Sequence, residues 1–196
     1  ILSANWLLVQ RVKIIGFAYI DGRTEIVLKG DSSLLNGRKP MFVPCWTHDL
    51  RVTPCIVLRV SRLGKNIAVR FGNRYYDAIA PGADFMAYDV LSEARMAGDS
   101  WTRALAFDFS LAVGEFGTDG NYDGSIERAD GTVVALPPMP LVVSPDEAIH
   151  RASEIMTIRQ GDLVYIQYQT NGQAVFTNDI LRACQTQEEK LYCKIK

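Results

Sequence analysis

The chain has 196 residues, a length that suits one domain with a sizeable buried core. Hydrophobic residues make up 48% of the chain and charged residues 22%, as in ordinary globular proteins. The net charge of −1 gives no indication of a nucleic-acid partner or an anionic membrane surface, and no apolar run reaches the roughly 20 residues that a membrane-spanning helix needs.

Short β-type runs dominate the chain. The first two flank Asp21-Gly22, a dipeptide typical of a two-residue hairpin turn. The run CIVLRV at 55–60 is mostly apolar, which favours a core strand. The predicted strands cover residues 12–20, 24–28, 41–43, 55–60, 106–113, 131–136 and 162–169.

Fewer segments have helical character. We predict helices over residues 67–78, 90–97 and 145–156, with Gly98 ending the second. The third has the clearest signals, because Ser144 suits the N-cap, Pro145 suits the first turn, and its apolar residues recur at helical spacing. The tail 190–196 is predicted to be a solvated end or an edge strand. The coarse prediction is a single β-dominated domain with a few covering helices.

The first twenty residues are apolar but interrupted by polar and charged side chains. They lack the basic lead and the small-residue cleavage site of a secretory signal peptide. The sequence does not begin with methionine, and a trimmed N-terminus is one interpretation. Four scattered cysteines, with no CxxC pair and no zinc-finger spacing to a histidine, predict a reduced cytoplasmic protein. They are Cys45, Cys55, Cys184 and Cys193.

Four segments resemble motifs of the fumarylacetoacetate hydrolase family, and they occur in the family's order. The first is VLKGDSSLLNGRKPMFVPCWTHDLRVTPCIVLRVSRLGKNI, at 27–67. RYYDAIAPGADFMAYD, at 74–89, is similar to a stretch ending in an NDVSARD-type motif. SWTRALAFDFSLAVGEF, at 100–116, is similar to W-x-x-x-K-x-FD-x-x-x-P-x-G. MTIRQGDLVYIQY, at 156–168, is similar to FxTLxxGDLIxTGTP.

The resemblance implies a fold class and an assembly. The expected fold is mixed α/β and β-dominated, a fumarylacetoacetate-hydrolase-like β-roll or sandwich with a few covering helices. One such domain would span residues 1–196, with the similarity strongest over 27–169 and the strands at 55–60 and 162–169 central. The first 26 residues do not match, and the family's GxNYxxH segment is not recognisable there. Family members commonly form homodimers, so a homodimer is expected.

The resemblance also locates a metal site. Family members hold one divalent cation, Mg²⁺ or Mn²⁺, on three carboxylates, two of them from a Glu-x-Glu pair. The matching positions of that pair are Thr53 and Cys55, while the third carboxylate matches Asp84. A Thr hydroxyl is a weak neutral ligand, and a Cys sulfur is too soft for Mg²⁺. Asp84 is then the only retained metal ligand, a weak one, and we expect no cofactor.

Other family residues are replaced as well. The family's Lys matches Leu105, the Arg of its SARD-type motif matches Tyr88, and its TGTP turn becomes 166–169, Ile-Gln-Tyr-Gln. These losses favour a non-catalytic protein with a degenerate site that retains a pocket for a small ligand. The alternative is an active hydrolase, decarboxylase or tautomerase that acts on a small keto acid through a repurposed site. In that case Cys55 and His48 could form a nucleophile–base pair.

Overall fold

The computed structural model describes residues 12–36 and 38–196, so the interpretation of residues 1–11 falls outside the described part. Strand residues make up 43% and helix residues 18%, which confirms the β-dominated fold class. The strands are β1 (Ile14–Ile20), β2 (Arg23–Lys29), β3 (Leu34–Asn36), β4 (Leu50–Val60), β5 (Tyr76–Ala87), β6 (Leu111–Val113), β7 (Asp123–Glu127), β8 (Val133–Leu136), β9 (Leu163–Gln167), β10 (Gln173–Ala174), β11 (Ile180–Gln185) and β12 (Glu188–Lys194). The helices are α1 (Tyr88–Ala97), α2 (Thr102–Leu105) and α3 (Pro145–Ile155), with 3-10 turns η2 (Asp31–Ser33) and η3 (Val69–Arg74).

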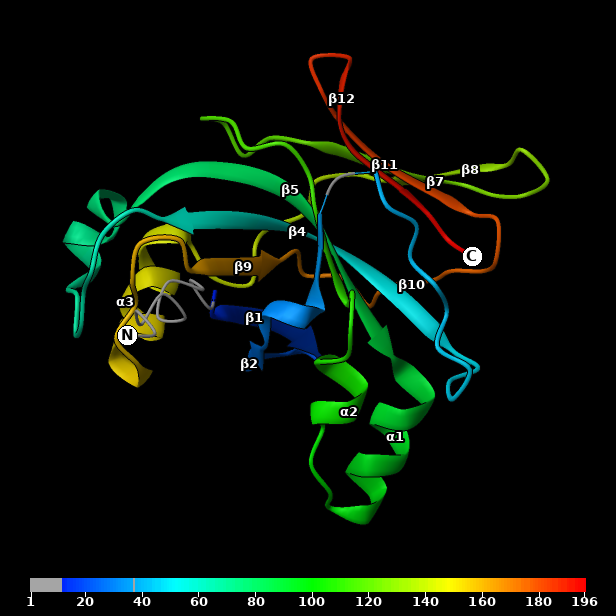
Figure 1. Ribbon diagram of the computed structural model, residues 1–196, viewed down its shortest axis with the longest axis horizontal. Helices are drawn as coiled ribbons and strands as arrows, with labels where there is room; N and C mark the ends of the chain where they lie inside the picture. Colours follow the sequence, from blue (N-terminus) through cyan, green and yellow to red (C-terminus); the bar gives the residue numbers. More distant parts are fainter. Residues whose placement is uncertain (1–11, 37) are drawn as a thin grey trace, which may run out of the picture.

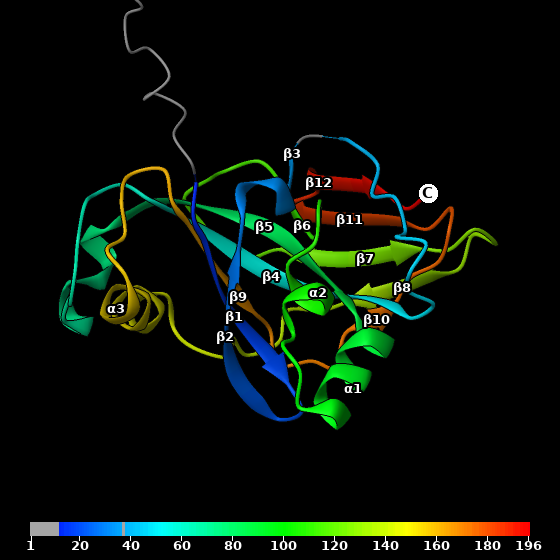
Figure 2. The ribbon, with the colours of Figure 1, turned by 60° about the horizontal axis from the view of Figure 1, so that its bottom comes forward.

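The strands form two sheets (Figure 1). The larger sheet has the order β2-β1-β9-β4-β5-β6-β3, with β10 paired to β4, and the smaller has the order β12-β11-β7-β8. Figure 2 shows the smaller sheet beside one end of the larger one. Within the larger sheet β1 pairs with β9 and β3 with β6 in parallel, whereas the long β4–β5 ladder is antiparallel. The expectation that 55–60 and 162–169 contribute central strands is confirmed, because β4 and β9 lie in the middle of the order.

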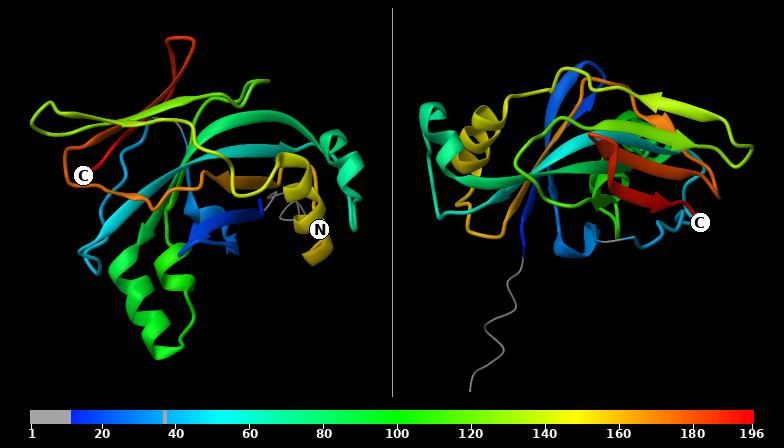
Figure 3. Two further views of the ribbon diagram at one scale, coloured as in Figure 1. Left: turned by 180° about the vertical axis from the view of Figure 1, so that it is seen from behind. Right: turned by 90° about the horizontal axis from the view of Figure 1, so that it is seen from above.

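The larger sheet curls strongly. In a flat sheet β2 and β5 would lie about 19 Å apart, since four strand spacings of about 4.8 Å separate them. Yet the side chains of Lys29 on β2 and Asp84 on β5 are in contact, with 2.6 Å between Nζ and Oδ1. The sheet must therefore roll so that its β2 edge approaches β5 and β6 across the concave face. The view from above in Figure 3 shows the β1–β2 hairpin crossing the line of the central strands.

Helices cover the roll at opposite ends. α1 and α2 lie together below the sheet in Figure 1, while α3 lies at the far end against η3. Leu91 of α1 and Leu105 of α2 pack with Ala18 and Val27 of the β1–β2 hairpin and with Met86 of β5. Of the helices in the described ranges, none combines the length and apolar character needed to cross a membrane.

Several predicted elements are confirmed. The hairpin turn at Asp21-Gly22 has positive φ at both residues, 49° and 78°, as a type I′ turn requires. Ser144 caps α3 by accepting a hydrogen bond from the Glu147 amide, and Gly98 ends α1 in the left-handed conformation. The C-terminal tail forms most of β12, an edge strand of the smaller sheet.

Other predicted elements are wrong. The expected helix at 67–78 is a short 3-10 turn followed by the start of β5, a twelve-residue strand. The paired aromatic residues Tyr75 and Tyr76 there suit a strand better than a helix interior. The expected strand at 106–113 is reduced to β6, because α2 and an irregular segment precede it. Around Met41 there is only an isolated bridge to Ile195.

Candidate functional site

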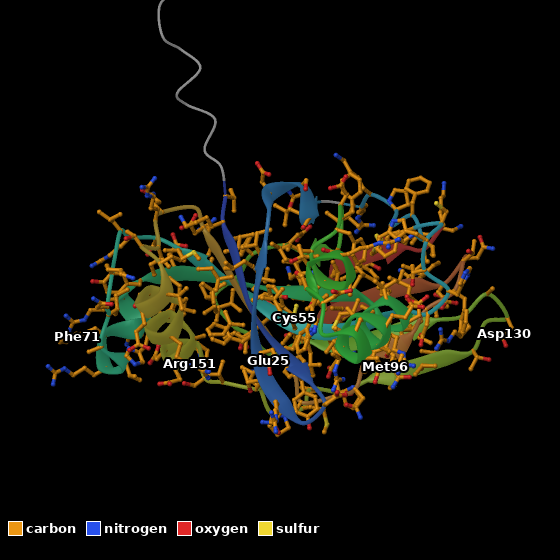
Figure 4. All side chains as sticks on the ribbon, turned by 90° about the horizontal axis from the view of Figure 1, so that it is seen from below. Glu25, Cys55, Phe71, Met96, Asp130 and Arg151 are labelled. Carbon is orange, nitrogen blue, oxygen red and sulfur yellow. The ribbon has the colours of Figure 1, made fainter. Side chains whose placement is uncertain are left out.

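The three positions matched to the family's metal ligands come together on the concave face of the roll. Thr53 of β4 lies directly opposite Asp84 of β5, and Cys55 lies opposite Gly82 on β5 and Gln167 on β9. Strand alternation places all of these side chains on one face, because each pair shares a register position. In Figure 4 the label of Cys55 lies between the β1–β2 hairpin, marked by Glu25, and the helices.

A lysine lies against the retained carboxylate. Lys29 ends β2 with its side chain fully buried, and its Nζ forms an ion pair with Asp84 Oδ1 at 2.6 Å, a close contact without hydrogen-bond alignment. The same ammonium donates hydrogen bonds to Ser110, at 2.9 Å to Oγ and 3.2 Å to the carbonyl oxygen. Ser110 precedes β6, so this cluster joins the β2 edge of the curled sheet to β5 and β6 on the other side of the roll.

The second oxygen of Asp84 is also occupied. Gln167 Nε2 donates a hydrogen bond to Asp84 Oδ2 at 2.6 Å, and its Oε1 accepts one from the Tyr19 amide at 2.7 Å. These two bonds fix which end of the amide faces the carboxylate, because only the NH₂ group can donate. Gln167 stands where the family resemblance puts the glycine of the TGTP turn. Its side chain therefore fills space that a glycine would leave open.

An aromatic ring closes the floor of the site. Tyr165 is fully buried, and Lys29 Nζ lies 5.7 Å from its ring centroid. The ring covers Gly16 so closely that a Cβ atom there would lie 2.0 Å from Tyr165 Cζ. Only a residue without a side chain fits below this ring. The space between β1 and β9 is thus filled by protein atoms.

Burial dominates the electrostatics of these groups. It raises the pKa of Asp84, an effect that Lys29 and Gln167 oppose. Burial, reinforced by the negative charge of Asp84, raises the pKa of the Cys55 thiol well above its ordinary range. Burial and the Asp84 carboxylate also raise the pKa of Tyr165. Neutral thiol and phenol groups therefore surround one ion pair.

Thr53 is covered from the other side. Its Oγ1 is buried and has no hydrogen-bond partner among residues 12–36 and 38–196. A Cβ atom at Gly172 would lie 2.9 Å from that oxygen, so the loop before β10 approaches the strand directly over Thr53. A glutamate at position 53 would need space that this loop now occupies.

The structure places the remaining matched positions around the site's edge. Leu105 is buried against the hairpin and α1, and its carbonyl oxygen accepts a bond from Ser110. Tyr88 begins α1, and the Arg51 guanidinium lies 3.7 Å from its ring centroid.

His48 is exposed, and its amide donates a hydrogen bond to Asp89, whereas Cys55 is buried. The possible Cys55–His48 pair is therefore not supported.

The residues at this site do not fit a divalent cation. Mg²⁺ and Mn²⁺ favour several oxygen ligands that together carry negative charge. Here one carboxylate is present, both of its oxygens already have partners, and one of those partners is an ammonium group. Within the described ranges there is no group of three or more His, Cys, Asp or Glu residues that could hold a metal ion.

Sequence reasoning missed Lys29 and the role of Gln167. Glu25, Val27 and Lys29 alternate along β2 and share one face, which is a visible signal of a common environment. That face is buried at Lys29 only because the sheet curls. The curl brings Lys29 against Asp84, which lies 55 residues later in the sequence.

Comparisons with solved structures give consistent results. A putative fumarylacetoacetate hydrolase family protein from Yersinia pestis CO92 is 18% identical, with a TM-score of 0.80 and coverage of 95% of this chain and 92% of the other. A fumarylpyruvate hydrolase from Pseudomonas aeruginosa, solved with Mn²⁺ and pyruvate, is 18% identical, with a TM-score of 0.74 and coverage of 95% and 89%. A 5-carboxymethyl-2-hydroxymuconate delta-isomerase from Mycobacterium smegmatis is 17% identical, with a TM-score of 0.75 and coverage of 94% and 76%.

No protein-family model matches the sequence, and no curated protein matches it either. At these low identities the solved structures establish the architecture alone. The chain therefore has the fold of fumarylacetoacetate hydrolase family proteins over almost its whole length.

Proposed function

We propose that this chain is a fumarylacetoacetate hydrolase family member whose metal site is degenerate and which does not catalyse the family's reactions. The observation that carries the proposal is the state of Asp84. Its two oxygens bind Lys29 and Gln167, and the partner strand offers Thr53 and Cys55 in place of two carboxylates.

Charge balance supports the proposal. Three carboxylates and a divalent cation would sum to −1, whereas Asp84 and Lys29 already sum to zero. A divalent cation added here would bring two further positive charges next to a buried ammonium, with no additional carboxylate to offset them. Burying uncompensated charge is strongly unfavourable.

The geometry does not support the alternative function, an active enzyme with a repurposed site. A cysteine nucleophile acts as a thiolate and needs a cationic or basic partner in a partly exposed setting. Cys55 is 2% exposed, and both burial and Asp84 keep its pKa high. The thiol is therefore protonated at neutral pH and inaccessible to a substrate of ordinary size.

Cation binding tests the proposal directly. A cation present at 100 times its dissociation constant would stabilise the fold by about 2.7 kcal/mol. We expect millimolar Mg²⁺ or Mn²⁺ to leave the melting temperature unchanged and isothermal titration to show no saturable heat. A rise of several degrees that Asp84→Asn removes would contradict the proposal. The same assay with millimolar pyruvate tests whether a small keto acid binds without a metal.

Activity is the second test. Hydrolysis of acylpyruvates and decarboxylation of oxaloacetate both develop charge on an enolate oxygen, which a Lewis acid stabilises. We expect no turnover by the purified chain. Turnover that survives a chelator and disappears in Cys55→Ser would instead establish a thiol-based enzyme. Turnover that a chelator abolishes would reveal a cation site elsewhere.

Assembly and location also enter as proposals. We propose a homodimer, as the family resemblance implies, and sedimentation that shows only monomer at micromolar concentration would contradict it. We also propose a cytoplasmic location, because all four cysteines have free thiols, as in proteins from reducing compartments.

A further inference from the structure

The outer edge of β2 is available for strand pairing. β2 ends the larger sheet and, among the described residues, pairs only with β1. In the antiparallel ladder that begins with the Ile20–Arg23 pair at the turn, alternate residues direct their backbone groups towards β1 or away from it. Thr24, Ile26 and Leu28 therefore direct their N–H and C=O groups outwards.

A groove runs along this edge. A cavity of about 460 Å³ is bordered on one side by four consecutive β2 residues, 25–28, and on the other by the segment 99–106 that contains α2. Neighbouring residues of a strand point to opposite faces, so a cavity that touches all four follows the backbone edge itself. Trp101 and Leu105 form its apolar wall, and Ile26 and Leu28 are 36% and 50% exposed.

The groove has a negative rim. The charged side chains that border it are Glu25 and Asp99, both acidic. Neither forms an ion pair within residues 12–36 and 38–196, and Lys29 is turned away into the buried cluster with Asp84. Figure 4 shows Glu25 on the hairpin, with the helix that carries Met96 beside it.

We propose that this groove binds an extended peptide segment in which apolar and basic residues alternate. The segment would add to β2 as a further strand. Its backbone would pair with the outward groups of Thr24, Ile26 and Leu28. Its apolar side chains would lie beside the exposed Ile26 and Leu28 on one face, and its basic side chains would meet Glu25 and Asp99 on the other. Strand addition at a sheet edge gains affinity from backbone hydrogen bonds and specificity from alternate side chains.

A second copy of this chain fits the edge less well. Symmetric antiparallel pairing of two β2 strands about Ile26 would bring the two acidic rims together. Like charges that face one another across strands are unfavourable. A basic segment of another protein avoids this conflict, so the charge pattern favours a heterologous peptide.

Peptide probes test the proposal on the intact chain. The probe is a seven-residue peptide of alternating isoleucine and lysine with blocked ends, labelled for fluorescence anisotropy. Its controls are the isoleucine–glutamate counterpart and a version N-methylated at alternate amides, which cannot donate to β2. We expect a dissociation constant on the order of micromolar for the lysine probe. We expect at least about tenfold weaker binding for either control.

Matched variants distinguish binding at the β2 edge from nonspecific binding. The double variant Glu25→Lys/Asp99→Lys should bind the glutamate probe more tightly than the lysine probe. The control Glu93→Lys changes an exposed residue outside the groove and should keep the original preference. Ile26→Pro removes one outward N–H without removing a ladder bond, and it should weaken the lysine probe. Equal binding of all three probes would overturn the proposal. So would sedimentation showing a dimer that Ile26→Pro dissociates, because a second copy would then occupy the edge.

Discussion

The buried ion pair offers the sharpest test of the site's physical interpretation. Lys29→Met keeps most of the side-chain volume but leaves Asp84 buried without its countercharge. Removing one partner of a buried pair costs about 3–5 kcal/mol of unfolding free energy. A typical domain has about 5–15 kcal/mol in total, so the variant should unfold at a much lower urea concentration.

The magnitude can be assigned to the pair by a double-mutant cycle. Asp84→Asn alone should also be destabilising, because it leaves Lys29 buried and unpaired. The combined variant should lose about 2–3 kcal/mol less than the sum of the two single losses. Arg59→Met is the matched control, since Arg59 pairs with Asp77 at 2.8 Å but both side chains are nearly half exposed. Exposed pairs of this kind contribute about 1 kcal/mol or less.

The pH dependence has a defined sign. Lys29 lowers the pKa of Asp84, so the methionine variant should hold that carboxyl at a still higher pKa. When folding raises the pKa of a carboxyl, the protonated group adds to the free energy of unfolding at low pH. That addition is lost as the pH rises through the pKa of the folded state. The deficit of Lys29→Met should therefore shrink as the solution is acidified. A loss below about 1 kcal/mol at pH 7, or strictly additive single losses, would refute the interpretation.

Two further predictions concern packing and alkaline stability. Gly16→Ala should cost about 3 kcal/mol of unfolding free energy because its Cβ atom would overlap the Tyr165 ring, whereas Gly30→Ala, with its nearest neighbour 3.9 Å away, should change little. Burial raises the pKa of Cys193 from 9.0 to about 11, so the stability that the protonated thiol contributes is present below pH 9 and is lost between pH 9 and 11. Cys193→Val should therefore lose about 3 kcal/mol less unfolding free energy than the wild type between pH 9 and 11 in urea titrations. Equal losses would contradict the assignment.

The sequence predicts some elements of this fold well because their signals are local. The Asp21-Gly22 turn and the Ser144 cap depend on backbone geometry within a few residues. The prediction for 67–78 fails because its apolar spacing is compatible with a helix, whereas residues 69–74 form a short 3-10 turn and Tyr76 begins a long strand paired with β4. Tertiary pairing overrides weak local preference in such segments.

The candidate site is only partly visible in the sequence for the same reason. The family resemblance correctly brings Thr53, Cys55 and Asp84 towards one face, since they occupy paired strands. It does not reveal that Lys29 supplies the countercharge, because β2 approaches β5 only through the curl of the sheet. It identifies position 167 as changed from glycine, but not that the new amide binds Asp84.

The strand order has a consequence for how the chain folds. β9 lies between β1 and β4, so residues 163–167 must be present before the N-terminal hairpin can join the rest of the larger sheet. During synthesis the hairpin cannot join the sheet until β9 has been made, and Lys29 stays hydrated until β9 inserts. Such non-local pairing is slow and exposes strand edges to wrong partners. A nascent chain that stops before residue 163 should therefore engage chaperones, whereas one extended beyond residue 167 can close the roll.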